Sequence, residues 1–199
     1  MQAFWDHVEV ATQDASQPWH WPALATVEQG EPRVRTIVLR AINRAERSLI
    51  AQVHGASPKV AQLERQPQAE WLFYDPNLRI QVRARGQTTL HRDDPLANDR
   101  WQSLPKAGRK MYQGEFPPSS SRLTNGQSSS NHCQPSPFLD ARTNDAEKGP
   151  QDPNRGRDNF CVLETQVDRI DWYDLRPADQ IRWLFKWQNS SWQAQPLVP

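Results

Sequence analysis

The chain has 199 residues, and its 24 basic and 23 acidic side chains leave a formal net charge of +1 at pH 7. A nucleic-acid-binding protein usually shows a basic stripe or a clearly basic balance, and this sequence has neither. The hydrophobic fraction of 36% is low and the 17 prolines are many, which indicates that part of the chain is loop. The length suggests one domain, or one domain with a large insertion.

The sequence also argues against membranes, metals and disulfides. No apolar run approaches the roughly 20 residues that a membrane span needs. The N-terminus, MQAFWDHVEV, is acidic and lacks the apolar core of a signal peptide. Two cysteines, Cys133 and Cys161, are too few for a disulfide framework or a zinc site. We therefore expect a soluble cytoplasmic protein with no bound metal, nucleic acid or membrane.

The first half of the chain predicts strands joined by short connections. The run 33–42 is rich in β-branched residues and indicates one long strand, and the polar stretch NRAER connects it to the next strand as a hairpin. Two helices are predicted by their apolar spacing, at 3–13 and 59–66, and Pro67 ends the second. The other predicted strands of this half are 23–27, 48–53, 69–74 and 79–91.

The second half contains an irregular stretch followed by more strands. Asp93 or Asp94 caps a helix that runs through Trp101, and a shorter helix follows Pro105. Residues 113–158 are rich in Pro and Ser and predict a low-complexity loop or insertion. Strands resume at 159–167, 169–175, 180–187 and 191–197 as an antiparallel meander. Many strands, short connections and few helices favour an antiparallel barrel over a doubly wound fold.

The segment RTIVLR places basic side chains on both faces of an apolar strand. One face carries Arg35 with Ile37 and Leu39, and the other carries Arg40 with Thr36 and Val38. A charge within an apolar strand is costly unless it has a partner or reaches water. The two arginines therefore mark either the solvated ends of a strand or a site that binds a ligand.

A second candidate site is the small polar turn that opens the predicted helix at 59–66. Pro58 suits the first helical position and Ser57 is a natural N-cap. The free N–H groups of such a helix start, with Lys59 beside them, also suit an anion. Capping alone explains the serine and the proline, and the pairing with Arg35 favours the anion. His54, before this turn, is interpreted as a surface histidine.

These segments, in this order, resemble the pyridoxamine 5′-phosphate oxidase-like flavoproteins. The match is closest to a branch described mainly as FMN-binding proteins without an assigned substrate, and it covers most of the chain except 113–158. The resemblance implies one split antiparallel β-barrel domain over residues 1–199, mainly β with a few helices, that binds FMN as a homodimer. The matching pieces are RTIVLR (35–40), SPK (57–59), QVRARG (81–86), WQSLP (101–105), DW (171–172), IRWLF (181–185) and WQAQPLVP.

The resemblance also implies which residues hold the cofactor. Arg35 and Lys59 would bind the FMN phosphate, and Ser57 would add a hydroxyl donor. Arg40 would lie near the reactive face of the ring. The other implied contacts are the backbone of Thr36, Ile37 and Val38 along the ring edge, and the side chains of Gln81, Trp172 and Arg182, some of them from the partner subunit.

Two departures from the family pattern limit the functional expectation. Ala56 stands where the family usually has an arginine, so one phosphate contact is lost. The oxidase itself has Tyr, Arg and Ser at three positions where this chain has Arg100, Leu104 and Gly108. Activity on pyridoxamine 5′-phosphate is therefore not expected. We expect an FMN-dependent oxidoreductase with an unknown substrate. The alternative is a split-barrel ligand carrier that binds flavin weakly or not at all.

Overall fold

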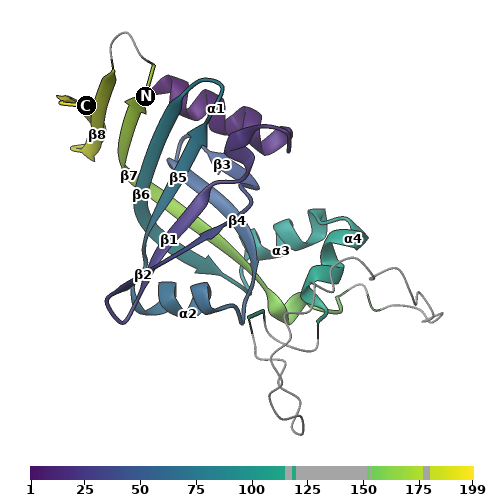
Figure 1. Ribbon diagram of the computed structural model, residues 1–199. Coiled ribbons are helices and arrows are strands. Elements are labelled where there is room, and N and C mark those ends of the chain that lie inside the picture. The colour runs from purple at the N-terminus through teal and green to yellow at the C-terminus, as the bar shows by residue number, and fades with distance from the viewer. Residues whose placement is uncertain (115–117, 120–151, 153, 177–179) are drawn as a thin grey trace, which may run out of the picture.

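The alternating strands of the chain form one antiparallel sheet that curls into a split barrel (Figure 1). The structure, a computed structural model, describes residues 1–114, 118–119, 152, 154–176 and 180–199. Most of the predicted loop at 113–158, Cys133 included, lies outside the described residues. The strands are β1 Ala23–Glu28, β2 Glu31–Thr36, β3 Ala41–Asn43, β4 Ser48–His54, β5 Gln68–Asp75, β6 Ile80–His91, β7 Phe160–Asp174, β8 Ile181–Gln188 and β9 Ser191–Leu197.

The helices pack against the two ends and one side of this barrel (Figure 1). They are α1 Gln2–Gln13, α2 Pro58–Arg65, α3 Pro95–Ser103 and α4 Lys106–Arg109, with 3-10 turns η1 Pro18–His20, η2 Lys110–Tyr112 and η4 Arg157–Asn159. Both predicted helices of the first half, and the fold class, are confirmed. No helix among the described residues is long and apolar enough to cross a membrane.

The prediction of one strand over 33–42 was wrong, because the chain changes its pairing partner there. β2 pairs with β1, whereas β3 pairs with β4 on the far side of the barrel. Between them, the amides of Ile37 and Leu39 donate to the carbonyls of Pro22 and His20 at 2.9 and 3.0 Å. Both side chains are buried. The predicted alternation of faces therefore persists through a segment that belongs to no ladder.

The predicted strands 159–167 and 169–175 are one strand, β7, which is bent at the predicted boundary. Arg85 of β6 pairs with Arg169, but Gly86 pairs with Val167, so Asp168 is an extra residue on the β7 side. This bulge shifts the alternation of β7 by one residue. Val167 and Ile170, three positions apart, consequently both face the core.

Buried aromatic side chains fill the barrel. Trp71 is fully buried, and its Nε1 donates to Thr165 Oγ1 at 3.0 Å. Phe4 of α1 packs its ring edge against Phe73, with the ring centroids 5.8 Å apart. Val60 and Leu63 of α2 join the same core. Helix α1 therefore covers one end of the barrel and α2 the other (Figure 1). Each helix has one apolar face, and packing that face against the core removes it from water.

We predict that Gly86→Ala strongly destabilises the fold. A Cβ at this position would lie 2.0 Å from the Gln166 carbonyl oxygen, which is backbone and cannot move without breaking the ladder. Overpacking of this kind costs on the order of 3 kcal/mol, measurable by urea unfolding. Gly108→Ala in α4 is the matched control, because its Cβ would meet only side-chain atoms at 3.4 Å or more. Equal unfolding midpoints for the two variants would contradict the prediction.

Candidate functional site

The turn between β4 and α2 gathers basic side chains around a buried hydroxyl. Ser57 is 2% exposed and occupies the N-cap position, but its hydroxyl makes no capping bond to the helix. It accepts instead a hydrogen bond from Lys59 Nζ at 3.1 Å. Burial lowers the pKa of Lys59, and the charge of Arg35 lowers it further. The structure therefore brings together the three residues predicted to hold a phosphate.

Arg35 reaches this turn from the inner face of the sheet. It pairs with Leu24, whose side chain is fully buried, so both point toward the barrel interior. Its guanidinium donates to Thr26 Oγ1 at 2.6 Å and to Gln62 Oε1 at 2.9 Å. Burial lowers the pKa of Arg35. The side chain is thus anchored between β1 and α2.

His54 is a member of this group that the sequence interpretation assigned to the surface. Its Nδ1 accepts the Ala56 amide at 3.2 Å, so the ring proton of the neutral form is on Nε2. Nε2 is buried and has no partner among the described residues. Burial lowers the pKa of His54, and Lys59 contributes to this shift. Nothing in the local sequence pattern signals this arrangement, because it depends on how the turn packs.

The segment that joins β2 to β3 exposes its other face. Thr36 and Arg40 are exposed and Val38 is partly exposed, whereas Ile37 is buried. The Arg40 amide donates to the Ile50 carbonyl at 2.8 Å. The positive charge of the Arg40 side chain acts on the hydroxyl of Tyr112. Burial raises the pKa of Tyr112 to about 12, and Arg40 opposes that rise. The predicted ring-edge segment therefore has an accessible side.

The remaining predicted residues lie on the far part of the sheet and do not share one face. Gln81 pairs with Tyr173, which pairs with Arg182, so these three side chains form one cross-strand row on the outer face. Trp172 points the opposite way, and its ring lies 6.1 Å from that of Trp19 beside α1. The sheet itself separates Arg35 from Gln81. Within one chain, the two groups of predicted cofactor residues do not meet.

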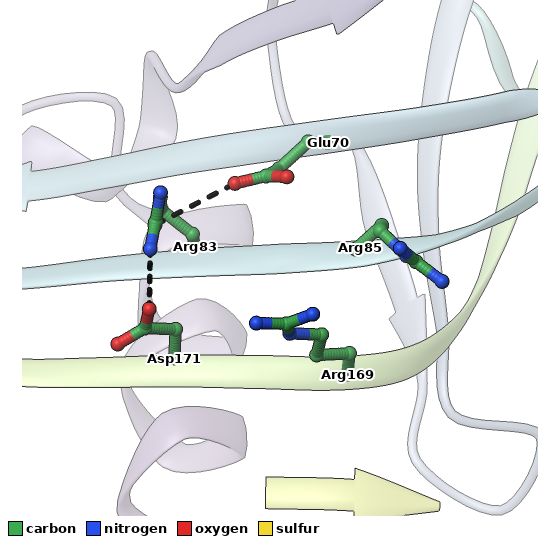
Figure 2. Close-up of a pocket in the computed structure, with 5 residues that line it drawn as sticks. All are labelled: Glu70, Arg83, Arg85, Arg169 and Asp171. Atoms are coloured by element: carbon green, nitrogen blue, oxygen red, sulfur yellow. Dashed lines mark hydrogen bonds and ion pairs between the residues drawn. The ribbon is translucent and has the colours of Figure 1, made fainter. Parts of the chain in front are cut away.

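A buried carboxylate organises the outer face next to this row (Figure 2). Asp171 is 5% exposed and accepts bonds from Arg182 at 3.0 and 2.9 Å, and another from Arg83. Arg83 also lies 3.6 Å from Glu70 on the neighbouring strand β5. Burial alone would raise the pKa of Asp171, but the bonds from Arg182 and Arg83 outweigh it and lower the pKa. The predicted flavin ligand Arg182 is therefore held in place by Asp171.

Comparison with known proteins places this architecture in a class. Residues 2–92 match the family of the pyridoxamine 5′-phosphate oxidase FMN-binding domain. A pyridoxamine 5′-phosphate oxidase-related FMN-binding protein from Nostoc punctiforme is 25% identical, with a TM-score of 0.72 over 100% of this chain and 96% of its own. No curated protein sequence matches the chain with significance.

Two more distant structures share the fold. PhzG from Burkholderia lata, solved with tetrahydrophenazine-1-carboxylic acid, is 16% identical, with a TM-score of 0.64 over 100% of this chain and 90% of its own. A protein related to general stress protein 26 from Clostridium acetobutylicum is 10% identical, with a TM-score of 0.53 over 92% and 94% of the two chains.

The fold is that of the pyridoxamine 5′-phosphate oxidase-like split barrels. More narrowly, residues 2–92 match the pyridoxamine 5′-phosphate oxidase FMN-binding domain family, and the fold agrees with that match over the rest of the described chain. The resemblance inferred from RTIVLR and SPK is thereby confirmed, since both segments lie inside the matched range.

We predict that Asp171→Asn lowers the free energy of unfolding by roughly 1–3 kcal/mol at neutral pH, because two arginines lose their charged acceptor. The native pKa of Asp171 is lowered, so its stabilisation is present above the unfolded value of about 4 and is lost as the pH falls below it. The difference in the free energy of unfolding between wild type and Asp171→Asn should therefore disappear at acidic pH. Asp168→Asn is the control, since Asp168 is half-exposed and makes only a 3.8 Å ion pair; a pH-independent gap for Asp171→Asn would rule out this role.

Proposed function

We propose that the protein binds FMN and holds its phosphate with Arg35, Ser57 and Lys59. The convergence of these three residues, from β2 and from the start of α2, is the observation that carries the proposal. No carboxylate accepts a hydrogen bond from Lys59 or Arg35 within the described part of the chain, and burial disfavours the positive charge of both. A dianionic phosphate supplies the missing counter-charge.

The chain's residues would bind and orient the flavin, which when bound supplies the redox chemistry. The backbone of Thr36 to Val38 runs along the ring edge in this proposal, and Arg40 orients the ring or the substrate from its exposed position. His54 offers a further donor to the phosphate through Nε2. It stands close to Ala56, where the family's arginine is missing. We infer an oxidoreductase whose substrate is unknown.

A homodimer is part of this proposal. Gln81 and Arg182 lie on the outer face, across the sheet from Arg35, so they reach the flavin only if it belongs to a second copy of the chain. Leu72 and Tyr74 are 38% and 48% exposed on the same face, which gives it apolar surface to bury. Two-fold symmetric dimers are the commonest soluble oligomers.

A flavin-free ligand carrier is the second candidate, and one feature of the structure favours it. Arg35 already donates to Thr26, Gln62 and the Leu24 carbonyl, so its bonds are satisfied without a phosphate. The visible spectrum of the purified protein distinguishes the two candidates. A yellow protein with flavin absorbance supports the first. A colourless protein that takes up no added FMN supports the second.

We predict that FMN binds more tightly than riboflavin and that Lys59→Gln removes most of the difference. Loss of one charge-assisted contact costs roughly 2 kcal/mol, or about thirtyfold in Kd, measurable by fluorescence titration. Arg65→Gln, at the other end of α2, is the matched control and should leave both affinities unchanged. Arg35→Ala is less suited to this test, because its structural bonds would be lost as well. Equal affinity of the wild type for the two flavins would sink the phosphate assignment.

We predict a mass of two chains in light scattering at micromolar concentration. Leu72→Asp on the exposed outer face should weaken the dimer, because it places a charge on apolar surface that the proposed interface would bury. Leu78→Asp is the control, since Leu78 is similarly exposed but lies in the turn after β5. A wild-type mass of one chain would contradict both the dimer and a composite flavin site.

A further inference from the structure

Three positive side chains stand directly opposite one another on the outer face of the sheet. Arg85 of β6 pairs with Arg169 of β7, and Arg169 pairs with Lys186 of β8. Side chains opposed in this way have Cβ atoms roughly 5 Å apart, and like charges in such a row destabilise a sheet. The cationic row, Arg85–Arg169–Lys186, is therefore a feature that the fold accommodates at a cost in stability.

Neighbouring carboxylates do not neutralise this row. Arg85 has one ion pair, to Asp168 at the long distance of 3.8 Å, and its Nε is buried without a hydrogen-bond partner. The side chains of Arg169 and Lys186 make no hydrogen bond or ion pair with any residue that the structure describes. Glu70 is opposite Arg85 in the register, yet its carboxylate turns to Arg83, as Figure 2 shows.

The carboxylates of this face are already taken by other cations. Asp171 is shared by Arg83 and Arg182, and Glu70 lies against Arg83. Arg85 and Arg169 line a hollow together with Glu70, Arg83 and Asp171. Figure 2 shows no bond from either arginine to those three residues, with Arg169 directed toward Asp171 and the Arg85 guanidinium directed away. Counted together, five basic side chains share three carboxylates: Arg83, Arg85, Arg169, Arg182 and Lys186 against Glu70, Asp168 and Asp171.

We propose that the cationic row binds a phosphate group, either free or carried by a small molecule. Guanidinium groups from two neighbouring strands suit the oxygens of a tetrahedral oxyanion, and Lys186 adds a third positive charge in the same cross-strand row. A divalent anion cancels the two excess charges of the face, whereas a monocarboxylate cancels only one. The repulsion within the row, which is unfavourable in the free protein, becomes binding energy when the phosphate enters.

This site is separate from the proposed flavin phosphate site. Arg35 and Lys59 lie at the α2 end on the inner side of the sheet, whereas the row lies on the outer face. It is also distinct from the row of Gln81, Tyr173 and Arg182. Four residues along β6 separate Gln81 from Arg85, which corresponds to about 13 Å.

The test is a thermal unfolding series in chloride and in inorganic phosphate at equal ionic strength. Wild type should unfold at a higher temperature in phosphate. Arg169→Gln should lose that shift, and in chloride it should be more stable than wild type, because the repulsion is gone. Its Kd for phosphate, by calorimetry, should be at least tenfold weaker. Arg33→Gln is the control, since Arg33 is an exposed arginine paired with Glu28 and Glu31; it should keep the wild-type phosphate shift.

Three outcomes would overturn the proposal. An equal phosphate shift in wild type and Arg169→Gln would show a general salt effect. A shift lost in Lys59→Gln but kept in Arg169→Gln would place the phosphate at the start of α2, which overturns this inference and supports the proposed flavin site. A change of molecular mass in Arg169→Gln would show that the row contacts a second copy. Glycerol 3-phosphate, tested beside inorganic phosphate, identifies an ester as the ligand if it binds more tightly.

Discussion

The close approach of Gly86 to the backbone of Gln166 and Val167 is the constraint on which the sheet depends. Only a residue without a side chain allows β6 and β7 to meet at this distance, and the extra residue Asp168 follows on the partner strand. The bend divides β7 into two halves with different neighbours. The first half pairs with β4 and closes the barrel, and the second half pairs with β8 and extends the sheet beyond it.

The same bulge arranges the charges of the outer face. By shifting the alternation of β7, it turns Ile170 toward the core and places Arg169 and Asp171 outward. Asp171 then meets Arg83 and Arg182 from the strands on either side. Arg169 meets Arg85 and Lys186 in the next row. A favourable ionic cluster and an unfavourable cationic row thus lie two residues apart on one strand, and both follow from one irregularity in the ladder.

The barrel divides the basic groups of the protein between its two sides. Arg35 and Lys59 are partly buried at the α2 end, where burial lowers the pKa of each. Arg182 and the cationic row are on the outer face, exposed to water or to another chain. Buried cations without carboxylate acceptors are costly for the folded state, and proteins tolerate such costs at sites that bind ligands. This burial cost is the physical basis of the proposed flavin phosphate site, whereas repulsion between opposed like charges is the basis of the second phosphate site on the outer face.

The sequence by itself determined the elements that depend on neighbours along the chain. Period-two alternation and turn residues located the strands, and the apolar spacing located α1 and α2, because these signals are local. It also placed Arg35, Ser57 and Lys59 in one family pattern, and placed a strand boundary at Asp168 where the bulge lies.

Tertiary structure decided whatever depends on which strand lies beside which. The run of β-branched residues gives no sign that the chain changes its pairing partner between Ile37 and Arg40. That change follows from where β1 and β4 lie, because β2 pairs with β1 and β3 pairs with β4. The anchoring of Arg35 by Gln62 and the row Arg85–Arg169–Lys186 join residues far apart in the chain, and the burial of His54 Nε2 depends on how its turn packs. Cross-strand register and helix packing set these contacts, and neither is encoded in the spacing of residues along a single segment.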